Sequence, residues 1–97
     1  MIITILEGHV PANRWNDFEN SYREVIKHLP VQLKETFLIQ DEHDTTLWRV
    51  ITVWKSREDF DEIKFNPVFH NWAELYRTVG VESTQRTFNV VAHHTHV

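Results

Sequence analysis

The chain has 97 residues, 41% of them hydrophobic and 25% charged, so it predicts one globular domain over residues 1–97 with a modest core. It contains no cysteine, which excludes disulfides, thiolate catalysis and cysteine-ligated zinc. The formal charge of −4 without a basic stripe argues against nucleic acid as a partner, and no apolar run approaches the ~20 residues that span a bilayer. No signal-peptide pattern opens the sequence, so we expect a cytoplasmic protein.

The first third of the chain predicts a strand followed by a helix. Residues 2–10 are rich in β-branched side chains, which favour a strand, and Gly8 near its end indicates a bulge or a close backbone approach. Pro11 opens a helix with one apolar stripe, and Pro30 cannot continue it. The stripe consists of Trp15, Phe18, Tyr22, Val25 and Leu29.

A hairpin and a short helix are predicted next. Residues 33–40 and 46–55 have strand composition and flank the polar turn 41–45, so we expect them to pair. Ser56 begins a segment shaped like a capping box, which predicts the start of a short helix. The residues expected to point inward from that helix are Phe60 and Ile63.

The last third predicts another helical segment and a final strand. Asn66-Pro67 supplies a cap residue and a first-turn proline, and Gly80 ends the helix. Its apolar side consists of Phe69, Trp72, Ala73 and Tyr76. The strand is expected over 81–93, best defined at 87–92. The order β-α-β-β-α-β predicts an α+β, ferredoxin-like fold, with both helices on one face of a four-stranded antiparallel sheet.

The segment 47–54 is apolar on both of its alternating faces. Leu47, Ile51 and Val53 share one face, and Trp48, Val50 and Trp54 share the other. Helices on one side of the sheet cover only one of these faces, and each large apolar residue left in water costs ~2 kcal/mol. We therefore expect a homodimer through the open sheet face. The alternative is a monomer whose C-terminal tail folds over that face.

One stretch of sequence resembles a known family. The run Val53-Trp54-Lys55-Ser56-Arg57-Glu58-Asp59-Phe60, with the element order and the two-faced strand, resembles the antibiotic biosynthesis monooxygenase family of dimeric α/β barrels. Asn66-Pro67-Val68-Phe69 is similar to the small-Pro-x-Phe step of that family. The resemblance implies a homodimer with a cleft between each sheet and its helices that holds aromatic polyketides, quinols or haem. Some members oxidise such substrates with dioxygen and no added cofactor.

The chain also departs from the family pattern. Many members carry histidines at the positions of Ile63 and Val68. The haem-degrading branch uses an asparagine, a tryptophan and a histidine, and our alignment places Glu7, Ile63 and Ala73 at those positions. The resemblance therefore argues against haem degradation by that triad.

Cofactor-free oxygenation in an apolar cleft is helped by a base whose pKa lies near the working pH. His70 is the predicted catalytic base, because it lies on the helix expected to line the cleft; the alternative is a solvent-facing residue. Trp72 and Tyr76 on the same helix are predicted either to contact substrate, with the Tyr76 hydroxyl as an anchor, or to belong to the core. Trp72 lies ~200° around the helix from His70, so the two cannot both point squarely into one pocket.

Three further residues are predicted to bind substrate. Arg49 interrupts an apolar strand, so it either holds a phenolate or carboxylate of the substrate or pairs with Glu35 or Glu7. Trp54 is a predicted wall of the cleft. Asn13, where the first strand meets its helix, is expected to reach the cleft mouth.

The chain ends in the most metal-like group of side chains. On a strand, His94 and His96 would share a face with His93 beside them, but no third ligand or supporting partner is identifiable, and a polar chain end is the alternative. The family resemblance implies a cofactor-independent monooxygenase acting on a small apolar, aromatic or quinol-like ligand. A non-catalytic binding or assembly module of the same fold is the alternative, and a metal-binding dimer is the third possibility.

Overall fold

The computed structural model describes residues 1–64 and 71–97. Within them the elements are β1 (Ile2–His9), two short 3-10 helices (Ala12–Arg14 and Ile26–His28) on either side of α1 (Trp15–Val25), β2 (Leu33–Gln40), β3 (Leu47–Trp54), α2 (Arg57–Ile63), α3 (Asn71–Arg77) and β4 (Thr84–Asn89). The predicted helix start at Asn66-Pro67 and the apolar residue Phe69 lie outside the described residues. The order of elements confirms the predicted α+β ferredoxin-like fold.

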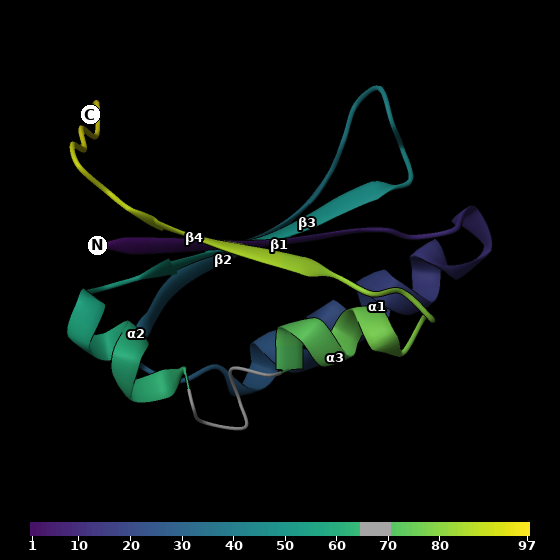
Figure 1. The fold of residues 1–97 in the computed structure, drawn as a ribbon, viewed down its shortest axis with the longest axis horizontal. Helices are drawn as coiled ribbons and strands as arrows, with labels where there is room; N and C mark the ends of the chain where they lie inside the picture. Colours follow the sequence, from purple (N-terminus) through teal and green to yellow (C-terminus); the bar gives the residue numbers. More distant parts are fainter. Residues whose placement is uncertain (65–70) are drawn as a thin grey trace.

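The four strands form one antiparallel sheet in the order β2-β3-β1-β4. Figure 1 shows α1, α2 and α3 on the same side of this sheet. The two central strands, β1 and β3, carry the most apolar sequences, as expected of strands that have neighbours on both edges. One sheet face is therefore covered by helices, and the other is not.

Of the two orientations left open for β3, the structure has Trp48, Val50 and Trp54 turned toward the helices. The buried residues on this side form two clusters. The larger cluster contains Leu6, Val10, Phe18, Tyr22, Trp48, Val50, Trp72, Leu75, Tyr76 and Val79. The smaller one contains Ile2, Trp54, Phe60 and Ile63, which confirms the two inward residues predicted for α2.

Element boundaries follow the predicted signals. The Ser56 side chain accepts a hydrogen bond from the Asp59 backbone N–H at 3.0 Å, which caps α2. Gly80 has a φ of 75°, a left-handed conformation that suits glycine after the end of α3. Gly8 pairs regularly with Trp48, so it is not a bulge. It marks the place where the side chains of Tyr76 and Val81 come close to the backbone of β1.

One predicted strand boundary differs from the structure, and one strand is irregular. The last strand runs over Thr84–Asn89 and does not reach 93, because its pairing with β1 ends at the Ile2–Asn89 pair. In β2, an irregularity between Leu33 and Glu35 breaks the alternation of side chains. Leu33 therefore packs with the core, while Glu35 turns to the other side of the sheet.

The sheet face away from the helices, called the open face below, combines apolar side chains with two acidic and two basic ones. Its residues include Ile3, Ile5, Glu7, Glu35, Phe37, Ile39, Leu47, Arg49, Ile51, Val53, Thr84, Arg86 and Phe88. Phe37 is 46% exposed and Phe88 38% exposed. The segment after β4 leaves the sheet without covering this face (Figure 1), and Val91 within it is 96% exposed.

Candidate functional site

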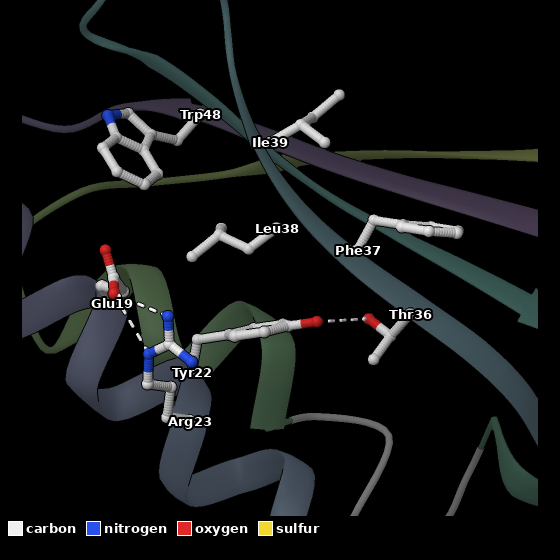
Figure 2. A pocket seen from close by; sticks show the side chains of 8 residues that line it. All are labelled: Glu19, Tyr22, Arg23, Thr36, Phe37, Leu38, Ile39 and Trp48. Carbon is white, nitrogen blue, oxygen red and sulfur yellow. Dashed lines mark hydrogen bonds and ion pairs between the residues drawn. The ribbon is translucent and has the colours of Figure 1, made fainter.

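A crevice of about 350 Å³ opens between α1 and the edge strand β2 (Figure 2). Apolar and aromatic side chains supply much of its lining, with a few polar groups among them. The lining residues are Glu19, Tyr22, Arg23, Thr36, Phe37, Leu38, Ile39 and Trp48. An apolar concavity with a few fixed polar groups is typical of a small-molecule site.

The charged groups of the crevice are already paired. Arg23 donates from Nε and Nη2 to Oε2 of Glu19, at 3.1 and 2.9 Å. Both side chains are about half exposed, so this pair forms the wet rim of the crevice. The Tyr22 hydroxyl donates to Thr36 Oγ1 at 3.3 Å, near the long limit of a hydrogen bond. The polar groups left for a neutral ligand are therefore hydroxyls.

Aromatic packing fixes the walls of the crevice. Trp72 stacks on Tyr22 with ring centroids 5.5 Å apart and an interplanar angle of 25°. Trp48 contacts Phe18 edge to face at 5.8 Å, and its indole N–H donates to the Thr45 carbonyl at 3.1 Å. Neighbouring rings and hydrogen bonds hold the side chains of Tyr22 and Trp48, so the crevice is largely preformed.

Tyr76 lies below the sheet surface with no solvent exposure. Its hydroxyl donates to the Trp48 carbonyl at 2.7 Å and also lies 3.3 Å from the Leu6 carbonyl. Burial, with a smaller effect of the Glu7 charge, raises the pKa of this hydroxyl far above its ordinary value. It therefore stays protonated and ties α3 to β1 and β3.

Two other predicted ligand contacts lie away from the crevice. Trp54 is buried in the smaller cluster, where its indole N–H donates to Thr4 Oγ1 at 3.1 Å. Arg49 lies on the open face and donates to Glu7 Oε2 at 2.7 Å, with Asp41 Oδ1 at 3.9 Å. The observed ion pair with Glu7 is one of the two roles that the sequence left open for Arg49.

Of the remaining predicted residues, some lie away from the crevice and one falls outside the described part of the chain. Asn13 is exposed in the first 3-10 helix. His70 lies outside the described residues and stays a prediction. His93, His94 and His96 are exposed, and residues 1–64 and 71–97 contain no group of three or more His, Asp or Glu side chains placed to hold a metal ion. No helix among the described residues is long and apolar enough to cross a membrane.

Sequence reasoning identified one residue beside the crevice, Trp72, and missed the four that make its inner surface. These are Tyr22, Thr36, Leu38 and Trp48. Tyr22 and Trp48 have the spacing of core residues, and they are core residues that also border the crevice. The available signal was a tyrosine hydroxyl in an otherwise apolar helix stripe, since a buried hydroxyl requires a polar partner.

Comparison with known proteins identifies the fold. No family model and no curated protein matches the sequence. Among solved structures, a proposed antibiotic biosynthesis monooxygenase from Deinococcus radiodurans is similar with a TM-score of 0.78 and 8% identity, over 100% of this chain and 99% of that one. MhuD, solved as a variant with two manganese protoporphyrin IX molecules per active site, is similar with a TM-score of 0.78 and 19% identity, over 99% and 100% of the two chains.

SnoaB, a cofactor-independent oxygenase from Streptomyces nogalater, is a third similar structure, with a TM-score of 0.72 and 14% identity. The match spans 95% of this chain and 94% of SnoaB. At such low identities these likenesses define the fold and leave the activity to the site. The full-length structural neighbours of this chain include antibiotic biosynthesis monooxygenases, and the chain has their ferredoxin-like fold.

Proposed function

We propose that this protein is a cofactor-independent monooxygenase that binds a small aromatic or quinol-like substrate in the crevice between α1 and β2. The observation that carries the proposal is the crevice itself, where Leu38 and Trp48 form apolar walls beside the hydroxyls of Tyr22 and Thr36. Such a lining accepts a flat, mostly hydrocarbon molecule with a neutral oxygen. The shared fold with SnoaB, a cofactor-independent oxygenase, supports the reaction class.

The proposed chemistry needs dioxygen and a substrate that readily forms an enolate or phenolate. For anthrone as a model, a base removes a proton from the ring methylene, and the carbanion reduces dioxygen. One oxygen atom becomes the new carbonyl of anthraquinone, and the other leaves as water with the two methylene hydrogens. His70 is the proposed base, because histidine titrates near neutral pH.

Blocking the crevice is expected to abolish binding and turnover without unfolding the protein. Leu38 lines the crevice from β2 and is only half-buried, so Leu38→Trp places an indole in the ligand volume at little cost to the core. We expect anthrone-dependent oxygen uptake, one O2 per anthraquinone formed, to fall at least about tenfold. Lys34→Trp, on the same strand but outside the crevice, is the control and should keep full activity. Equal uptake by both variants would contradict the site.

Removing the proposed base gives a separate test of catalysis. His70→Ala is expected to lower the rate of oxygen uptake about 10²-fold, the usual scale for loss of a general base, while anthrone still binds. His28→Ala, an exposed histidine after α1, is the matched control. Raising the pH should partly rescue His70→Ala, because hydroxide then replaces the missing base. A variant with unchanged turnover would remove His70 from the mechanism.

A second candidate function is a non-catalytic ligand-binding or assembly module of the same fold. The observation that favours it is the Tyr76 hydroxyl, which donates to backbone and offers no reactive group to a substrate. Anthrone or quinol binding, measured by a rise in melting temperature, without oxygen uptake would select this function.

The proposed active form is a homodimer through the open face. Phe37 and Ile39 are exposed at one edge of this face and Phe88 at the other, with Ile51 and Ile5 on the strands between them, and a second copy would cover this apolar area. The two acidic and two basic residues of this face balance one another, so two copies can meet without net repulsion. A two-fold arrangement of sheet against sheet satisfies both features.

A further inference from the structure

Threonines occupy the same level of all four strands on the helix-covered face of the sheet. Thr52 of β3 pairs with Thr36 of β2 on one side and with Thr4 of β1 on the other, and Thr4 pairs with Thr87 of β4. This threonine row passes between the two apolar clusters, because Val50 and Leu6 lie on one side of it and Trp54 and Ile2 on the other. A row of hydroxyls through a core is costly unless each one is hydrogen-bonded.

Thr52 is the buried threonine of this row whose hydroxyl lacks a hydrogen bond among the described residues. Thr4 Oγ1 accepts from the Trp54 indole, and Thr36 Oγ1 accepts from the Tyr22 hydroxyl. Thr52 is 0% exposed, and its Oγ1 has no hydrogen-bond partner within the described part of the chain. An apolar valine would fit the same shape without leaving a polar atom unsatisfied. The hydroxyl therefore calls for a partner that the described part of the chain does not supply.

Thr52 does not itself line the crevice, but its neighbour on β2 does. Thr36 lines the crevice and lies directly opposite Thr52, and side chains opposite each other on neighbouring strands have Cβ atoms about 5 Å apart. Figure 2 shows the Tyr22 hydroxyl pointing at Thr36. Because that hydrogen bond is long, at 3.3 Å, an incoming ligand oxygen can replace it at small cost.

We propose that Thr36 and Thr52 form the polar inner end of the crevice and hydrogen-bond a hydroxyl or carbonyl oxygen at the leading end of the ligand. This inference rests on the proposed function, which places the ligand between Leu38 and Trp48. A threonine hydroxyl donates and accepts, so it suits a phenol or a quinone carbonyl equally. It cannot compensate a buried carboxylate, so the site selects neutral oxygen-bearing aromatics over both hydrocarbons and carboxylates.

The test compares 1-naphthol with naphthalene, which share a ring system and differ by one hydroxyl. Wild-type protein is expected to bind 1-naphthol about tenfold more tightly than naphthalene, the scale of one buried neutral hydrogen bond. Thr52→Val should bind naphthalene at least as well as wild type and lose the preference for naphthol. Thr87→Val, at the exposed outer end of the same row, should keep the preference.

The outcomes separate this inference from the proposed function. Thr52→Val should fold with a melting temperature at or above that of wild type, so a lost preference is not a folding defect. If wild type binds both aromatics and Thr52→Val retains the naphthol preference, the threonine anchor is wrong while the crevice stands. If wild type binds neither aromatic, the proposed function itself fails.

Discussion

Replacing Ile51 by lysine is expected to separate the proposed dimer into monomers. Ile51 lies at the middle of the open face, with Phe37 and Ile5 as its cross-strand neighbours. In a two-fold interface the substitution buries two unpaired ammonium groups, which costs about 4 kcal/mol and raises the dissociation constant roughly 10³-fold. Sedimentation equilibrium should give twice 11.7 kDa for wild type and a single 11.7 kDa chain for the variant.

The control places the same charge elsewhere on the surface. Val31 is 80% exposed in the loop before β2 and does not belong to the open face, so Val31→Lys should remain a dimer. Ile51→Lys should keep its fold as a monomer, because a half-exposed lysine can extend its amine into water. Wild type that sediments as a single chain at micromolar concentration would contradict the dimer.

Gly8→Ala is expected to lower stability by about 2 kcal/mol, which corresponds to a fall in melting temperature of about 10 °C. A Cβ at Gly8 would lie 2.9 Å from Tyr76 Cδ1 and 2.9 Å from Val81 Cγ1. The Tyr76 ring cannot retreat, because it has no solvent exposure and its hydroxyl donates to backbone. Thermal unfolding followed by circular dichroism at one fixed protein concentration measures the effect.

A double variant distinguishes steric overlap from a change in backbone freedom. Gly8→Ala combined with Val81→Ala removes one of the two close contacts, so the double variant should lose less stability than the sum of the single variants. Gly80→Ala provides the contrasting case, because no atom lies within 4 Å of its added Cβ and only the φ of 75° resists it. A Gly8→Ala variant as stable as wild type would contradict the tight approach of α3 to β1.

The fold was predictable where one short-range signal decided the outcome. The strand at 47–54, the cap at Ser56 and the glycine that follows α3 all depend on signals within a few residues, and each is confirmed. The end of β4 was not predictable in this way. Val90 and Val91 have strand composition, but a strand needs a neighbour, and pairing with β1 ends at Ile2.

The candidate site was harder to predict from the sequence than the fold, because its lining comes from elements that are far apart in the chain. Arg49 and Trp54 lie five residues apart on β3, so they point to opposite faces of the sheet and cannot share a pocket. Tyr22 looked like an ordinary member of an apolar stripe, and its role at the crevice follows from the position of Thr36 on another element. Thr52 shows the same difficulty, since an unsatisfied hydroxyl becomes visible only once its surroundings are known.

Two other concavities offer a clear contrast to the crevice. One, of about 260 Å³, lies on the open face and is lined by Arg49, Arg86 and Phe88 among others. The other, of about 310 Å³, lies between α1 and α3 beside Glu24 and Glu74. Both present more charge to a ligand than the inner end of the crevice does, and a second copy would cover the first of them.

A crystal structure of the protein with 1-naphthol bound tests the crevice most directly. We expect the ring between Leu38 and Trp48 and its oxygen within hydrogen-bond distance of Thr36 or Thr52. Density for the ligand on the open face or between α1 and α3, with the crevice unchanged, would contradict the account.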